Sequence, residues 1–377
     1  MSTHTSRFKQ TRFEAHSGSL LMKAVVTMGS GDFDMLSYCD VPMPVLDKGE
    51  ILIKVGAAGV NNTDINTRLG WYSSSVTSGT NTSSEGAQKE ESDDGGWNGK
   101  SMFPFIQGTD CCGMVSATFS KSDAHLIGKR VIVRPCVRPD GFSSPNNTWI
   151  GSNSDGAFAE YIKVPATEAF PVVCDWSDAE LATLPCSYGT AENMLHRANL
   201  RDGEHVLITG ASGGVGSAAV QLAKRRGAIV TAVTTADKAE LVKSIGADII
   251  IDRGDAPESS FTEESVDVVV DNVAGPNFGN MIRILKRGGR YVSSGAIAGP
   301  MVTLDMRDFY LKDLNLIGCT GWDEPVFGNI VSYIERGEIK PLLAKSYPLK
   351  NIADAQRYFI RKEHFGNLAL TLPQTES

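Results

Sequence analysis

Residues 204–235, EHVLITGASGGVGSAAVQLAKRRGAIVTAVTT, show the pattern of a β-strand, a glycine-rich turn, an α-helix and a second strand. The turn carries Ala211-x-Gly213-x-x-Gly216, a variant of the GxGxxG fingerprint with alanine in first place. Glycine at 213 lets the backbone approach a pyrophosphate, and Gly216 lets the helix pack close to its strand. The helix N-terminus offers free N–H groups to the phosphates. The unit predicts a bound dinucleotide, with a purely structural glycine turn as the alternative, and the expected contacts are Ala211, Ser212, Gly213, Gly214, Val215 and Gly216.

The end of the second strand indicates which dinucleotide binds. An enzyme that uses NAD usually places an acid there for the ribose hydroxyls, whereas this chain has Thr234 and Thr235, followed by Lys238. Hydroxyls and a lysine accept a 2′-phosphate that a carboxylate would repel, so the sequence favours NADPH over NADH. Asp237 argues the other way, although it lies past the strand, where a helix is expected to start. Arg253 either reaches the same phosphate or is a solvated loop charge.

The composition is that of a globular protein and limits the possible partners. With 377 residues, of which 41% are hydrophobic and 21% charged, the chain is long enough for two domains. Its net charge of −8 lacks the basic character that a nucleic-acid-binding face needs. No apolar run approaches the ~20 residues of a membrane helix. The seven cysteines form no CxxC pair, which argues against a disulfide framework and a structural zinc lobe. We expect a cytoplasmic protein with a small-molecule substrate and no nucleic-acid or membrane partner.

The character of the sequence changes along the chain and divides it into two expected domains. Residues 1–21 are polar and indicate a disordered tail, and residues 22–168 contain the short β-branched runs of a partly closed antiparallel barrel. Residues 73–101 are rich in Ser, Gly and acidic side chains, which predicts a flexible insertion, either a lid or a solvated loop. Strands alternate with helices over 169–323, which predicts a doubly wound parallel sheet. Residues 324–377, expected as helix, helix and strand, return to complete the first domain.

Together these motifs give the chain a resemblance to the medium-chain dehydrogenase/reductases, and within them to the zinc-independent, quinone-oxidoreductase-like branch. The matching stretches include AAGVNNTDINTRLGWY, PFIQGTDCCGMV, GAFAEYIKVPA, LPCSYGTAENML and DVVVDNVAG. The resemblance implies an α/β protein with a GroES-like β-barrel catalytic domain, a Rossmann cofactor domain, and an active site in the cleft between them. Relatives typically form a homodimer through the edge strand of the Rossmann sheet, and the apolar stretch 301–319 can supply that edge.

The same resemblance implies that no catalytic zinc is bound. Zinc-dependent members of the superfamily have a cysteine where this chain has Asn61, and a Gly-His-Glu stretch where it has Gly108-Thr109-Asp110. Only the third position keeps a thiol, Cys186, and one thiol does not make a catalytic zinc site. Cys186 is then expected to be a small buried side chain, with a substrate-facing thiol as the alternative.

Without a metal, the side chains of the loop GVNNTDINTRLGWY are the candidates to polarise a substrate. Asn61 supplies an amide N–H, Thr63 a hydroxyl and Tyr72 a phenol, and these three are the catalytic candidates. By resemblance, Asn61, Asp64 and Tyr72 line the substrate pocket, where Asn66 replaces a tyrosine found in many relatives. Asp64 has an alternative role as the cap of a helix that starts in this loop.

Further cofactor contacts are expected outside the glycine loop. Thr190 matches a threonine that contacts the nicotinamide carboxamide in relatives, and its alternative role is a helix-interior threonine bonded to its own backbone. Open α/β sheets bind ligands at the carboxyl ends of their strands, which adds Asn272, Val273 and Gly295. By resemblance, Asn367 lies where the C-terminal strand passes near the cofactor, at a position that is often Lys or Arg in relatives.

These observations predict an NADPH-dependent, zinc-free reduction of a quinone or an α,β-unsaturated carbonyl compound. Two alternatives stay open. One is an alcohol dehydrogenase or carbonyl reductase of the same superfamily, and the other is a dinucleotide-binding protein whose catalysis is vestigial.

Overall fold

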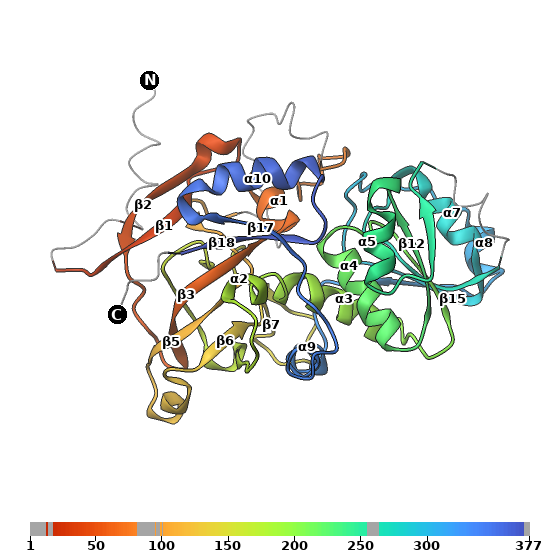
Figure 1. Cartoon of the computed structure of the whole chain (residues 1–377). Coiled ribbons are helices and arrows are strands. Elements are labelled where there is room, and N and C mark those ends of the chain that lie inside the picture. Colours follow the sequence, from red (N-terminus) through yellow and green to blue (C-terminus); the bar gives the residue numbers. More distant parts are fainter. Residues whose placement is uncertain are drawn as a thin grey trace, which may run out of the picture.

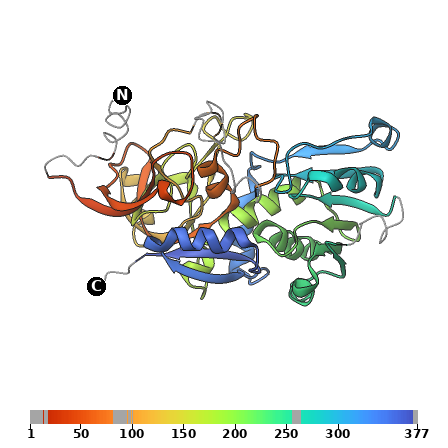
Figure 2. The same cartoon turned by 90° about the horizontal axis from the view of Figure 1, so that it is seen from above.

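The chain forms two lobes that lie side by side along the long axis of the molecule (Figures 1 and 2). Most of the expected tail and most of the expected insertion fall outside the residues that this computed structural model describes. Among the described residues, no helix is both long enough and apolar enough to cross a membrane. The described residues are 13, 18–80, 95, 99, 101–254 and 264–372.

The first lobe is rich in β-strands, which form from short apolar and β-branched runs bounded by Gly, Pro and Asp. Its strands are β1 (Leu21–Thr27), β2 (Leu36–Pro42), β3 (Glu50–Val60), β4 (Phe105–Ile106), β5 (Cys112–Thr118), β6 (Arg130–Val133), β7 (Cys136–Val137), β8 (Thr148–Trp149), β9 (Tyr161–Pro165), β10 (Ala169–Pro171), β17 (Leu343–Pro348) and β18 (Asn367–Thr371). One sheet has the order β2-β1-β4, and a second has the order β10-β6-β5-β3-β18-β17 with β9 also paired to β3. β7 and β8 pair with each other.

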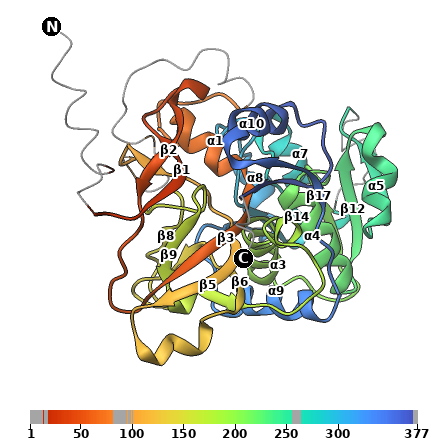
Figure 3. The ribbon, with the colours of Figure 1, turned by 60° about the vertical axis from the view of Figure 1, so that its left-hand side comes forward.

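The end of the chain returns to this lobe, although it contains a strand, β17, that was not expected between its two helices. β18 pairs antiparallel with β3, so that Leu368 lies opposite Val60, and it pairs parallel with β17. The helices of the lobe are α1 (Asn62–Leu69), α2 (Asp178–Leu181) and α10 (Ile352–Arg361). α10 lies over α1 in Figures 1 and 3 and buries Ile352, Ala355 and Phe359 in the core of the lobe. These three residues are spaced like the apolar face of a helix.

The second lobe is a six-stranded parallel sheet with helices around it. Its strands are β11 (His205–Ile208), β12 (Ile229–Thr234), β13 (Ile249–Asp252), β14 (Val266–Val270), β15 (Leu285–Ser293) and β16 (Asn315–Gly318). Its helices are α3 (Pro185–Arg197), α4 (Gly214–Arg225), α5 (Ala239–Ser244), α7 (Phe278–Arg283), α8 (Met306–Tyr310) and α9 (Pro325–Glu335). The strand order β13-β12-β11-β14-β15-β16 is the order of the doubly wound dinucleotide-binding fold. The fold class is therefore confirmed, while the domain boundaries at 168/169 and 323/324 stay a prediction.

Helix α3 joins the two lobes. Eleven of its thirteen residues are buried, and four of these, Ser187, Thr190, Glu192 and Asn193, are polar. One hydrophobic cluster contains Ala57 and Ile132 of the β-rich lobe, Leu195 of α3, and Val206 and Ile208 of the parallel sheet. The two lobes therefore share one hydrophobic core through α3.

The outer edge of the parallel sheet is open. β16 pairs only with β15 among the described strands, and α8 beside it lies at the end of the molecule farthest from the β-rich lobe (Figure 1). Large apolar side chains are exposed along this edge: Met301, Val302, Met306, Tyr310, Leu311 and Leu316. The homodimer predicted from the sequence would use this edge, and it stays a prediction.

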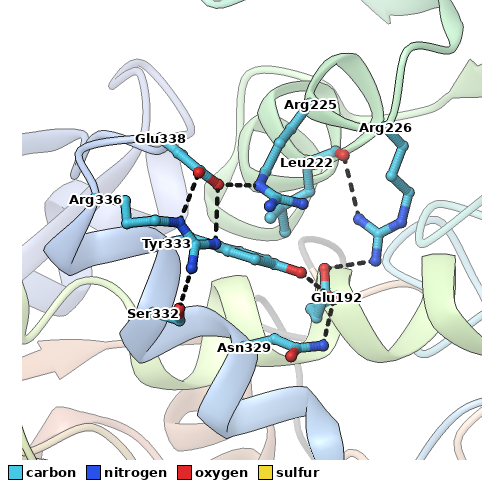
Figure 4. A network of polar contacts seen from close by, with 9 residues as sticks. All are labelled: Glu192, Leu222, Arg225, Arg226, Asn329, Ser332, Tyr333, Arg336 and Glu338. Carbon is cyan, nitrogen blue, oxygen red and sulfur yellow. Dashed lines mark hydrogen bonds and ion pairs between the residues drawn. The ribbon is translucent and has the colours of Figure 1, made fainter.

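Helix α9 is fixed to α3 and α4 by a polar network centred on Glu192 (Figure 4). Glu192 is fully buried and lies 2.7 Å from Arg226, a close ion pair that does not have the geometry of a hydrogen bond. The Tyr333 hydroxyl donates to Glu192 at 3.3 Å, and the guanidinium of Arg225 stacks on the Tyr333 ring at 3.6 Å. Arg225 also pairs with Glu338 at 2.5 Å. The network satisfies a carboxylate that would otherwise be buried without a counter-charge.

Replacing Arg226 with Met leaves Glu192 buried without its cation. We expect the variant to lose about 3–5 kcal/mol of stability, since breaking one partner of a buried pair strands the other. Arg336, whose side chain is 49% exposed and pairs with Glu338, is the matched control, and Arg336→Met should cost no more than about 1 kcal/mol. Urea unfolding curves of the three proteins check this, and equal midpoints for the two variants would contradict it.

Candidate functional site

The cleft between the two lobes is the candidate site. It encloses about 1050 Å³ of atom-free space, including the part open to solvent. Its walls come from α1 and the residue before it, from α3, from the turn between β11 and α4, and from the loops after β14, β15 and β16. None of the described residues that line it is Asp, Glu, Lys, Arg or His. The cleft is therefore polar in places but carries no formal charge on its surface.

Most of the residues predicted from the sequence line this cleft. They are Asn61, Thr63, Asn66, Tyr72, Thr190, Gly213, Gly214, Val215, Gly216, Asn272, Val273, Gly295 and Asn367. The predicted residues that do not line it are Asp64, Ala211, Ser212, Thr234, Thr235, Lys238 and Arg253. The polar loop and the glycine loop, which are far apart in the sequence, thus face one another across the same space.

The polar loop takes its shape from the start of helix α1. Asn61 has extended backbone angles (φ −126°, ψ 161°) and is the N-cap residue, and Gly70 ends the helix in the left-handed conformation. The backbone N–H of Asn61 donates to the Asp64 carboxylate at 2.8 Å. Burial raises the pKa of Asp64 to about 7. Asp64 therefore caps the helix from behind the cleft surface instead of lining the cleft.

A second buried carboxylate, Asp110, lies directly behind Asn61. The Asn61 side chain donates from Nδ2 to Asp110 Oδ2 at 2.7 Å, and the backbone N–H of Cys186 donates to Asp110 Oδ1 at 2.6 Å. Burial raises the pKa of Asp110 to about 7. Burial also raises the pKa of the Cys186 thiol, and the negative charge of Asp110 raises it further. The thiol is therefore held in its protonated form.

Tyr72 and Thr63 form a hydroxyl pair in the wall of the cleft. The Tyr72 hydroxyl donates to Thr63 Oγ1 at 3.3 Å. Burial raises the pKa of Tyr72, so the phenol stays protonated. A Thr63 hydroxyl that accepts from Tyr72 is free to direct its own hydrogen to another acceptor, such as a substrate oxygen.

The glycine loop is shaped by close backbone contacts. A Cβ at position 216 would lie 2.1 Å from the Gly210 carbonyl oxygen, and one at position 214 would lie 2.1 Å from Asn367 Oδ1. At position 213, by contrast, the nearest protein atom would be 3.6 Å away. Gly214 and Gly216 are thus required by the fold itself. Gly213, which is the N-cap of α4, leaves open space toward the cleft.

The C-terminal strand of the β-rich lobe docks on this loop. The Gly366 N–H donates to the Ser212 carbonyl at 3.0 Å, and Gly366 forms an isolated bridge with Gly213. Asn367 donates from Nδ2 to the Thr183 carbonyl at 2.8 Å and to Ser187 at 3.0 Å. Asn367 therefore links the two lobes by hydrogen bonds. Its amide nitrogen is already bonded to protein atoms.

The residues expected to distinguish NADPH from NADH lie at or just beyond the C-terminal ends of β12 and β13, outside the cleft surface. Thr234 is buried, and its hydroxyl has no partner among the described residues. Lys238 donates to the carbonyl of Lys362, whose own ammonium group donates to Asn62 Oδ1 at 2.8 Å. Burial, together with the positive charge of Lys238, lowers the pKa of Lys362 to about 7. Arg253 is exposed at the same edge.

At the ends of β14 and β15, Asn272 is held by the neighbouring loop. Its Oδ1 accepts hydrogen bonds from the backbone N–H and the hydroxyl of Ser294, at 2.9 and 2.8 Å. The described start of the expected insertion reaches this region from the other lobe, because Thr80 donates from its backbone to the Ile297 carbonyl at 3.0 Å. Residues 71–80 therefore cross the cleft and contact the second lobe.

Several residues of the site were not foreseen from the sequence. Trp149 and Trp322 line the cleft with an edge-to-face contact, their ring centroids 5.3 Å apart. Lys362 and Asp110 lie just behind the surface. None of these residues belongs to a local motif, and their proximity depends on the packing of the lobes. Among them only Asp110 carried a sequence signal, as part of the Gly108-Thr109-Asp110 stretch.

Comparison with known proteins gives matches along most of the chain. The model of the alcohol dehydrogenase GroES-like domain matches residues 47–173, and the model of a zinc-binding dehydrogenase matches residues 214–336. The chain is 30% identical over 362 residues to the acryloyl-coenzyme A reductase of Metallosphaera sedula, covering 93% of this chain and 100% of that protein. It is 27% identical over 359 residues to the quinone oxidoreductase of Mus musculus, covering 91% of this chain and 95% of the relative.

Solved structures give a similar result. A Sinorhizobium meliloti protein, assigned provisionally as an alcohol dehydrogenase, has a TM-score of 0.84 to this chain at 40% identity. The match covers 95% of this chain and 98% of that one.

Two glycine substitutions separate folding from dinucleotide binding. Gly213→Ala should leave the melting temperature unchanged, because its methyl group has room, and should weaken dinucleotide binding about tenfold or more, since the backbone must approach the pyrophosphate there. Gly216→Ala should lower the melting temperature, because its Cβ meets the Gly210 carbonyl. Thermal unfolding and dinucleotide titration check both. Equal dinucleotide affinities for Gly213→Ala and wild type would contradict the first expectation.

Proposed function

Because the chain belongs to the medium-chain dehydrogenase/reductase superfamily, we propose that it is an NADPH-dependent oxidoreductase that reduces a quinone or an α,β-unsaturated carbonyl compound without zinc. The observation that carries the proposal is the uncharged cleft, in which the neutral donors Asn61, Thr63 and Tyr72 face the glycine loop. Such a surface suits a neutral acceptor that gains negative charge on oxygen only as it is reduced.

The residues where zinc-dependent members hold their metal do not suit a zinc ion here. Those positions are Asn61, Thr109 and Cys186, an amide, a hydroxyl and one thiol, whereas zinc prefers thiolate, imidazole and carboxylate ligands. The Asn61 amide is already bonded to Asp110, and the pKa of Cys186 lies well above its usual range. No group of three or more His, Cys, Asp or Glu side chains in the described ranges is arranged to hold a metal. The donor set therefore supports a zinc-free reaction.

The preference for NADPH is supported by two lysines without carboxylate partners. Neither Lys238 nor Lys362 forms an ion pair with any described residue. Burial lowers the pKa of both lysines. The charge of Lys238 acts on Lys362, and Asp237 and Glu363 offset it only through space, so an anion beside the two lysines is favoured. The 2′-phosphate of NADPH would supply that anion, next to the unpartnered hydroxyl of Thr234.

The residues of the cleft would bind and polarise the substrate. A reduced nicotinamide supplies a hydride when bound. Asn61 and Thr63 would donate hydrogen bonds to the acceptor oxygen of the substrate, and Tyr72 would orient Thr63 through the hydrogen bond between them. Trp71 and the bridge from Thr80 to Ile297 would limit the entry of water on one side. With no charged residue at the surface, the final proton comes from the hydroxyl pair or from water.

Turnover with a panel of acceptors tests the proposed function. We expect oxidation of NADPH with 1,4-benzoquinone, 1,4-naphthoquinone or crotonaldehyde by the metal-free protein. Asn61→Ala should lower kcat about 10- to 100-fold, because it removes a donor to the developing charge, and Tyr72→Phe about tenfold, because it removes the hydroxyl that orients Thr63. No oxidation with any acceptor would contradict the proposal. One zinc per chain in metal analysis would favour an alcohol dehydrogenase instead.

The cofactor preference is tested at Lys238. Lys238→Met should raise KM for NADPH about 10- to 100-fold, the value of a hydrogen bond to a charged group, and leave KM for NADH within about twofold. Lys224, which pairs with Asp248 on the same domain, is the control, and Lys224→Met should change neither value. An equal rise in KM for both dinucleotides would show that Lys238 does not distinguish them.

A further inference from the structure

Asp110 is a fully buried carboxylate that does not line the cleft. It forms no ion pair with any residue in the described part of the chain. Each of its oxygens accepts a short hydrogen bond, 2.7 Å from the Asn61 amide and 2.6 Å from the backbone N–H of Cys186. A buried carboxylate with both oxygens bonded in this way is fixed in one orientation.

The two donors belong to different helices that line the cleft. Asn61 is the N-cap of α1, and Cys186 lies in the first turn of α3, and both line the cleft. The free N–H groups at the start of α3 favour a negative charge there. Asp110 therefore connects the loop that carries the catalytic candidates to the helix that carries Thr190.

The backbone of Gly59 packs closely against the carboxylate. A Cβ at Gly59 would lie 2.5 Å from Asp110 Oδ2 and 2.4 Å from the Ala182 carbonyl oxygen, so the backbone itself presses against this group. On its other side Thr109, also fully buried, reaches the Asp64 carboxylate at 3.5 Å. Asp110 thus holds the side-chain amide of Asn61, and Asp64 holds its backbone N–H.

The orientation of the Asn61 amide follows from this arrangement. An amide has two N–H groups and one oxygen, and a carboxylate accepts hydrogen bonds only. Asp110 therefore takes one N–H of Asn61 and opposes turning the amide over, while the amide oxygen faces the backbone N–H of Asp64 in a capping box, which leaves the other N–H for the cleft. A free asparagine would exchange these two faces.

We propose that Asp110 is a positioning residue, which acts through Asn61 by holding its amide in the orientation that the substrate oxygen requires. The inference rests on the proposed function, since it concerns a donor to the substrate of that reaction. It assigns a role to a residue that touches neither substrate nor cofactor.

A double-mutant cycle tests the proposal. Asp110→Asn keeps the shape of the side chain but replaces an acceptor with a donor, so Asn61 must turn its amide over to keep a hydrogen bond. We expect kcat to fall about 10- to 100-fold, with KM for NADPH within about twofold of wild type. In an Asn61→Ala background, Asp110→Asn should change kcat by less than about twofold, because the residue through which it acts is gone.

Glu168 provides the control for loss of a buried carboxylate. It is buried in the β-rich lobe, pairs with Arg134 at 2.6 Å and does not line the cleft. Glu168→Gln should lower the melting temperature and leave kcat unchanged. A Glu168→Gln protein with kcat reduced as much as in Asp110→Asn would show that the effect is one of general stability, and would overturn the proposal.

Two further outcomes would overturn it. One is an unchanged kcat in Asp110→Asn, and the other is an equal loss with and without the Asn61 side chain. If Asp110→Asn does not fold, the exchange Asn61→Asp with Asp110→Asn rebuilds the hydrogen bond with its direction reversed. That protein should fold and stay slow, because position 61 then has no N–H, and a kcat within about threefold of wild type would overturn the inference. Wild type that reduces no acceptor would instead contradict the proposed function.

Discussion

The docking of the C-terminal strand on the glycine loop holds the two lobes around the cleft. One backbone hydrogen bond, from Gly366 to Ser212, and the amide of Asn367 connect β18 to the start of α4 and to α3. The contact is possible only because position 214 has no side chain. A change at this point would move the substrate wall and the cofactor wall relative to each other. The geometry of every other contact across the cleft depends on it.

The cleft has neutral polar groups at its surface and carboxylates behind them. The surface of the cleft presents amides, hydroxyls, thiols and aromatic rings, while the carboxylates Asp64 and Asp110 lie one layer deeper. A carboxylate at the surface would oppose negative charge that develops on a substrate, whereas a buried one can orient a neutral donor without meeting the substrate. The two acids are thus placed where they organise the site at little electrostatic cost to a reduction.

The parts of the structure that the sequence predicts are those set by local pattern. The glycine loop, the alternating strands and helices and the returning tail all depend on short-range periodicity or on backbone needs of single glycines. The roles of Asp64 and Asn367 depend on partners: Asp64 had two readings in the sequence, and only the fold shows it bonded to Asn61. Asp110, Lys362 and the pair Trp149 and Trp322 come together through packing between lobes, which no spacing along the chain reveals. Thr234 and Lys238 lie at the expected strand end, yet outside the cleft surface.

The position of β18 in its sheet has a consequence for synthesis of the chain. This strand pairs with residues 57–60 of β3, beyond the part of β3 that pairs with β9, so that end of β3 has no partner on this side until residues 367–371 have been made. The parallel sheet of the second lobe, which is complete by residue 318, contains no strand from either end of the chain. On a ribosome the second lobe can therefore fold while the first is still open. Until then the nascent β-rich lobe exposes unpaired backbone groups at residues 57–60 of β3, an edge that can pair with another chain.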